Sequence, residues 1–219
     1  NTQGLLLSDM PTAMAEVAST FAEALAFEEV LKEEKNSNAR QNLLFARVQG
    51  IIEVGLGQLS YYDFERRVHT KRKNGELDAE RISDIWVETQ KEYYGPAVEL
   101  DEYDRYYWMV VPHFFETPFY VYSYAFAQMA TCALLQKYQE AQEAGPDAVA
   151  EFKENYTKFL ETGMTRNTYE MFEPFGLDPE MPEFWSNSVA FISKRLDALE
   201  KSANQKPAAK PKHAAPSAQ

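Results

Sequence analysis

The sequence is poor in the residues that build covalent and metal-bound frameworks. It contains one cysteine, Cys132, and three histidines, which excludes an intramolecular disulfide framework and a multi-cysteine zinc site. Only nine glycines are present, and alternating β-branched residues are scarce. No apolar run reaches the ~18 residues of a membrane-spanning helix, so no membrane partner is expected.

Basic residues are also in the minority. Lysine and arginine number 22 against 34 aspartates and glutamates, which gives a net charge of -12 in 219 residues. This acidic balance disfavours nucleic acid as a partner, because a phosphate backbone attracts basic surfaces. A lone thiol and the lack of an export signal predict a cytoplasmic protein.

The composition divides the chain into a body and a tail. Hydrophobic residues make up 45% and charged residues 26% of the chain, as in a globular protein. Residues 202–219 differ, because they contain lysine, proline and alanine but neither aromatic nor acidic side chains. We therefore expect a folded body over residues 1–201 and a disordered tail over residues 202–219, more suited to solubility than to binding.

The body has the pattern of an all-α protein. Apolar residues recur at helical spacing, and Asn-Gly or Gly-Pro pairs separate the periodic segments. Short connections between helices favour a multi-helix bundle. Helices are expected over residues 12–35, 39–73, 79–94, 119–144, 148–162 and 180–202.

A polar stripe lies on the first of these helices. Its members, at positions i, i+3, i+4 and i+7, are Glu16, Ser19, Thr20 and Glu23. A solvated helix face is one interpretation. Small neighbouring residues and the lack of a basic residue suggest the other, in which a packed carboxylate needs a cation or a metal.

An aromatic segment over residues 103–126 is the second candidate. It combines many tyrosines with His113 around two prolines. It can form an aromatic core, or its phenols and imidazole can line a cleft and donate hydrogen bonds to an oxyanion. The residues alone do not name a reaction.

Four segments, read together, resemble the oligoendopeptidase F branch of the thimet oligopeptidase-like zinc metallopeptidases. The resemblance covers about residues 4–200 and implies the C-terminal part of a zincin-type catalytic domain that hydrolyses short peptides. The segments that carry it are residues 14–23, 58–66, 112–126 and 174–178.

The resemblance implies a metal site that is shared with another segment. In the family, a His-Glu-x-x-His helix supplies two zinc ligands and the general base. A glutamate from a second helix is the third ligand, and the matching residue here is Glu16. Two imidazoles and a carboxylate leave one position open for a water molecule. Glu23 would orient a histidine ligand.

The same resemblance implies the substrate-binding groups. A histidine and tyrosines near the end of the domain hydrogen-bond the substrate and the oxyanion, and the matching residues are His113, Tyr120 and Tyr122. Which tyrosine contacts the oxyanion stays open, and Tyr124 is equally suited to packing.

No His-Glu-x-x-His motif occurs in the chain, and the first residue is Asn1 rather than methionine. We therefore expect a C-terminal fragment that is inactive alone and needs the missing N-terminal part of the same enzyme to bind one zinc ion. The alternatives are a non-catalytic peptide-binding or interaction module without the metal site, and a plain helical assembly protein.

Overall fold

A computed structural model describes residues 4–7 and 9–204. The expected all-α fold is confirmed, and no strand occurs within these residues. Short helical turns occur at η1 (Leu5–Leu7), η2 (Thr12–Met14), η4 (Gly95–Ala97), η5 (Asp104–Val110) and η6 (Glu170–Phe175). The α-helices are α1 (Val17–Glu33), α2 (Ser37–Ile52), α3 (Gln58–Arg72), α4 (Ala79–Tyr94), the single turn α5 (His113–Glu116), α6 (Tyr122–Ala144), α7 (Pro146–Glu161) and α8 (Pro182–Asn204).

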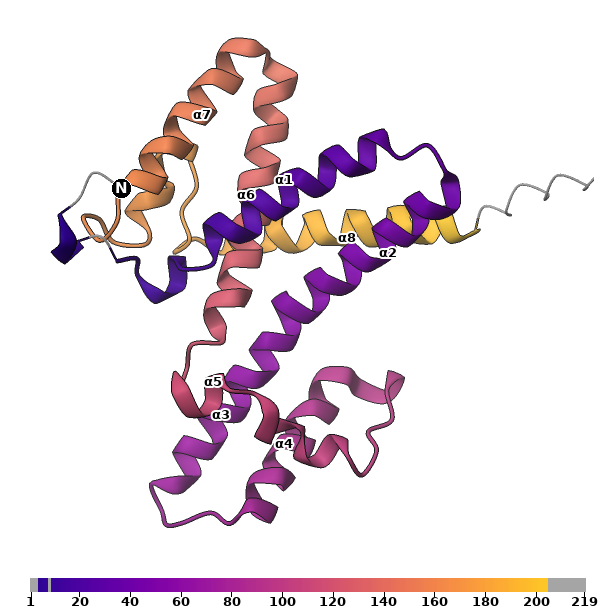
Figure 1. Ribbon diagram of the computed structural model, residues 1–219, viewed down its shortest axis with the longest axis vertical. Coiled ribbons are helices and arrows are strands. Elements are labelled where there is room, and N and C mark those ends of the chain that lie inside the picture. The colour runs from indigo at the N-terminus through magenta and orange to yellow at the C-terminus, as the bar shows by residue number, and fades with distance from the viewer. Residues whose placement is uncertain (1–3, 8, 205–219) are drawn as a thin grey trace, which may run out of the picture.

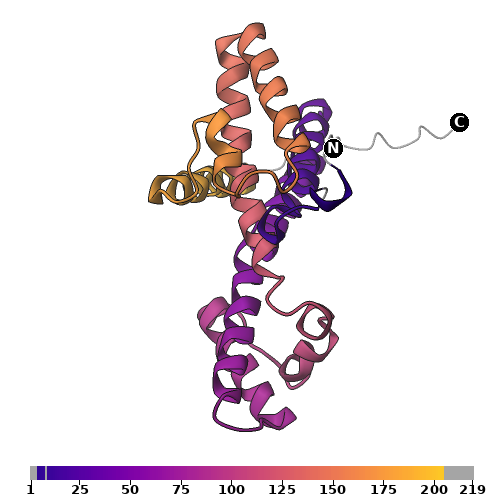
Figure 2. The same cartoon turned by 90° about the vertical axis from the view of Figure 1, so that its left-hand side faces the viewer.

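The helices form two lobes (Figures 1 and 2). The upper lobe contains α1, α6, α7, η6 and α8, and its core includes Phe21, Leu134 and Phe172. The lower lobe contains α3, α4, η5 and α5, and its core is built on Phe64 and Trp86. In both lobes buried apolar side chains from neighbouring helices pack against one another, as burial of amphipathic faces requires.

One long helical rod connects the lobes. The sequence predicts an uninterrupted helix over residues 39–73, but α2 and α3 are joined by a π-helical turn, η3 (Glu53–Gly57). A π turn frees backbone groups from the regular ladder, and the hydroxyl of Tyr93 donates to the Ile52 carbonyl at 3.1 Å. Gly55 is buried against Gln128 of α6, so the rod passes close to this helix of the upper lobe.

The C-terminal helix α8 continues to Asn204 and so passes the expected boundary between body and tail. The rest of the predicted tail, residues 205–219, lies outside the described residues. Within the described ranges, no helix has the length and apolar character needed to cross a membrane.

Candidate functional site

Glu16 stands at the junction of η2 and α1, immediately before the first residue of α1. Its carbonyl oxygen accepts hydrogen bonds from the hydroxyls of Ser19, at 3.0 Å, and Thr20, at 2.7 Å. These bonds occupy the backbone carbonyl of Glu16 rather than its side chain. The half-buried Glu16 carboxylate, which does not cap the helix, is therefore available to other partners at a helix N-terminus that favours negative charge.

The carboxylate of Glu16 meets Tyr120, a residue 104 positions away in the chain. The Tyr120 hydroxyl donates to Glu16 Oε1 at 2.8 Å. Tyr120 lies just before α6, which packs against η2 and α1. Burial, and then the hydrogen bond to Glu16, raise the pKa of Tyr120 to about 12. The phenol is thus held as a proton donor at neutral pH.

His113 completes the group. Its ring stacks on the ring of Tyr120, with centroids 5.6 Å apart and planes 17° apart. His113 Nε2 lies 3.1 Å from the hydroxyl of Tyr124, whose pKa is raised by burial and then by the charge of Glu16. We call Glu16, His113, Tyr120 and Tyr124 the carboxylate–tyrosine site. It brings one carboxylate, two phenols and one imidazole to the junction of the lobes.

Two residues that the sequence singles out lie apart from this site. The ring of Tyr122 packs edge-on against Tyr62 of α3, with centroids 6.2 Å apart. The Glu23 side chain is 71% exposed and forms an ion pair with Arg47 of α2 at 2.8 Å. Ser19 is exposed as well. In the described part of the chain, Ser19 and Glu23 of the polar stripe therefore face outward, whereas Glu16 and Thr20 are half-buried.

Sequence reasoning missed Glu65 of α3. Its side chain is buried, with 2% exposure, and Oε1 accepts the backbone N–H of Phe119 at 2.9 Å. Phe119 has a positive φ of 64°, a conformation that a bulky residue rarely adopts. Burial raises the pKa of the Glu65 carboxyl, and the bond from Phe119 acts in the opposite direction. Glu65 thereby fixes the turn that precedes Tyr120.

A signal for Glu65 was present in the sequence. Glu65 follows Tyr61 by four residues and adjoins Phe64, so it lies beside the apolar stripe of its helix. A carboxylate at such a position requires a hydrogen-bond partner. The partner lies 54 residues away, which helical periodicity cannot identify.

The donor atoms present do not complete a metal site. Among the described residues, no group of three or more histidine, cysteine, aspartate or glutamate side chains could hold a metal ion. The carboxylate–tyrosine site offers one carboxylate and one imidazole, whereas a catalytic zinc ion takes three protein ligands. No chemical step through a metal follows from these residues alone.

Comparison with known proteins identifies the family. The model of peptidase family M3 matches residues 1–191. An oligoendopeptidase F homolog from Borreliella burgdorferi is 29% identical over 188 residues, which are 85% of this chain and 30% of that protein. The oligopeptidase PepF of Bacillus subtilis is 29% identical over 188 residues, which are 85% of this chain and 27% of that protein.

The fold gives the same result. The crystal structure of oligoendopeptidase-F from Enterococcus faecium matches with a TM-score of 0.70 and 27% identity, over 89% of this chain and 36% of that one. The chain spans about 30% of the length of the curated relatives it matches. The resemblance that the four sequence segments indicate is therefore confirmed, and the chain belongs to peptidase family M3.

Proposed function

We propose that this chain contributes to the catalytic site of a zinc metallopeptidase that hydrolyses short peptides. The observation that carries the proposal is the 2.8 Å hydrogen bond between Tyr120 and Glu16. The family resemblance assigns a ligand role to Glu16 and a substrate role to the segment of Tyr120. These two segments, distant in sequence, meet at one point, as a shared site requires.

In this proposal Glu16 is the third zinc ligand, and a His-Glu-x-x-His segment outside the chain supplies the other two ligands and the general base. When bound, zinc would activate a water molecule for attack on the peptide carbonyl. The Tyr120 phenol, protonated until its pKa of about 12, would donate a hydrogen bond to the oxyanion. Because the phenol has a single O–H, it would leave Glu16 Oε1, to which it donates at 2.8 Å, when it donates to the oxyanion.

His113 and Tyr122 would hydrogen-bond the peptide. Tyr124 contacts the ring nitrogen of His113 at 3.1 Å and would set the orientation of its imidazole. Glu23 would orient a histidine ligand of the supplied segment, exchanging its exposed ion pair with Arg47 for that contact.

The test is to supply the other proposed ligands. A His-Glu-x-x-His segment from a relative, fused to this chain or added as a separate chain, should produce zinc-dependent hydrolysis of short peptides. Glu16→Gln should abolish this activity, because an uncharged amide is a poor zinc ligand. Glu33→Gln, an exposed change on the same helix, is the matched control and should leave activity unchanged.

Equal hydrolysis by the wild-type and Glu16→Gln assemblies would contradict the assignment of Glu16. Peptide binding without hydrolysis in the assembled protein would instead favour the non-catalytic peptide-binding module.

A further inference from the structure

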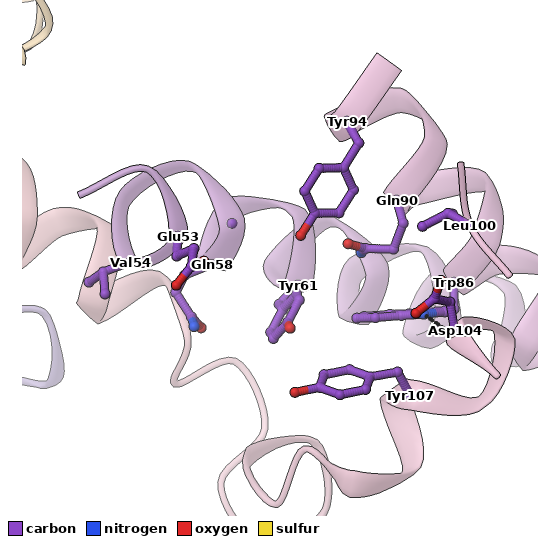
Figure 3. A pocket seen from close by; sticks show the side chains of 11 residues that line it. Glu53, Val54, Gln58, Tyr61, Trp86, Gln90, Tyr94, Leu100, Asp104 and Tyr107 are labelled. Atoms are coloured by element: carbon purple, nitrogen blue, oxygen red, sulfur yellow. Dashed lines mark hydrogen bonds between the residues drawn. The ribbon is translucent and has the colours of Figure 1, made fainter. Parts of the chain in front are cut away.

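A cavity of about 450 Å³ lies in the lower lobe, between η3, α3, α4 and η5 (Figure 3). It shares no residue with the carboxylate–tyrosine site. The rings of Tyr61, Tyr94 and Tyr107 stand around it, with Glu53 and Asp104 among the other lining residues. We call it the aromatic cavity.

The centre of the aromatic wall is the buried ring of Trp86. The ring of Trp86 lies 5.1 Å from that of Tyr61 and 6.3 Å from that of Tyr107, which is nearly parallel to it at 25°. Trp86 itself is buried, and its indole Nε1 donates to the Asp104 carbonyl at 2.8 Å. A preformed aromatic surface loses little freedom when a ligand binds.

The cavity has a negative electrostatic character. None of the described residues that line it is a lysine, arginine or histidine. Glu53 is exposed and accepts a hydrogen bond from the neutral amide of Gln49, and among the described residues it forms no ion pair. After burial, the charge of Glu53 is the largest cause that raises the pKa of Tyr94. The carboxylate field therefore reaches the aromatic wall.

We infer that the aromatic cavity binds an organic cation that carries N–H groups, an ammonium or a guanidinium, presented by a peptide. Electron-rich ring faces and a nearby carboxylate are the two features that attract such a cation. The side-chain amide of Gln58 also lines the cavity and can accept an N–H bond. The choice of a peptide as the carrier rests on the proposed function, whereas the cation site does not.

Binding can be measured on the full chain without any metal or activity. The indole N–H signal of Trp86 would be followed by NMR during titration with n-butylammonium or with a blocked Ala-Lys-Ala peptide. Both should shift this signal, while that of Trp185 in the upper lobe should not move. Butanol and the peptide with acetylated lysine should bind about tenfold more weakly, because they lack the cation.

Matched variants distinguish binding in the cavity from attraction of the cation to the net negative charge of the protein. Glu53→Gln should weaken binding of the lysine peptide about threefold to tenfold, whereas Glu143→Gln, which removes the same charge from an exposed site in α6, should have no effect. Tyr107→Leu should weaken binding similarly and Tyr107→Phe should not, since phenylalanine keeps a ring face. Tyr107 is 52% exposed, so the fold should tolerate both changes.

Equal binding of the charged and acetylated peptides would overturn the inference, as would wild-type affinity in both Glu53→Gln and Tyr107→Leu. Binding of n-butylammonium but not of the lysine peptide would contradict the inference that a peptide presents the cation. Because no hydrolysis is measured, a failure of the proposed peptidase function would leave these results unaffected.

Discussion

At the scale of single residues, the three tyrosines of the segment Tyr120-Val121-Tyr122-Ser123-Tyr124 have different surroundings. Tyr120 contacts Glu16, Tyr124 contacts His113, and Tyr122 packs against Tyr62. Residue type alone could not distinguish them, because all three carry the same phenol. Their partners in space suggest an order of importance that mutagenesis can test.

We predict that Tyr120→Phe lowers kcat of the assembled peptidase most. Loss of one oxyanion donor costs about 10²–10³ in kcat. KM should change less, because the phenol acts in the transition state. Tyr122→Phe should lower kcat in the same sense but less strongly. Steady-state kinetics on the two variants decide the order, and a larger loss of kcat in Tyr122→Phe would give the oxyanion role to Tyr122.

Glu65 allows a prediction on stability. Glu65→Ala leaves the Phe119 N–H without its acceptor and should lower the free energy of unfolding by about 1–3 kcal/mol. Glu65→Gln keeps an oxygen for this bond and removes the buried charge, so it should match or exceed the stability of the wild type at pH 8. Urea unfolding measures both variants, and an equal loss in both would contradict the role of the hydrogen bond.

The pH dependence of the Glu65 variant follows from the raised pKa of this carboxyl. A raised folded-state pKa stabilises the fold at low pH, and this contribution is lost as the pH rises from the ordinary glutamate value through the raised one. The difference in unfolding free energy between the wild type and Glu65→Gln should therefore move in favour of the variant over that interval. A difference independent of pH would contradict the assignment.

At the scale of elements, glycine has opposite roles at two positions. Gly50 lies inside α2 with nothing near the position of a Cβ atom, whereas Gly145 joins α6 to α7 with a positive φ of 121°. Gly50→Ala should raise the free energy of unfolding by about 0.5–1 kcal/mol, because alanine loses less entropy in a helix. Gly145→Ala should lower it by about 1–3 kcal/mol through backbone strain. Thermal unfolding of both variants would show opposite shifts in Tm, and shifts of the same sign would contradict this account.

Most element boundaries could be predicted from the sequence. Helix α4 ends at Tyr94 before Gly95-Pro96, and α6 ends at Ala144 before Gly145-Pro146, because glycine and proline end helices for local steric reasons. The π turn at Glu53–Gly57 could not be predicted, since it depends on contact with α6 and on the Tyr93 hydroxyl. Short-range periodicity carries no information on such contacts.

At the scale of the whole molecule, the site depends on the meeting of the lobes. The helical pattern predicts that Glu16 lies on a polar stripe, but not that Tyr120 contacts it. The family resemblance implies that Glu16 and the segment of Tyr120 belong to one site, and in the structure the two residues are hydrogen-bonded. The exposure of the Glu23 side chain and its ion pair with Arg47 likewise depend on how the helices pack. In the proposed assembly, the exposed part of the polar stripe of α1 would face the supplied zinc helix.

The central claim is that Glu16 is a zinc ligand, and zinc affinity of the assembled protein tests it most directly. With the His-Glu-x-x-His segment supplied, the wild type should bind one zinc ion. Glu23→Gln should weaken binding by about 10–100-fold, as loss of a residue that orients a ligand does. Glu16→Gln should weaken it more, and Glu33→Gln should not change it. Wild-type zinc affinity in Glu16→Gln would contradict the account.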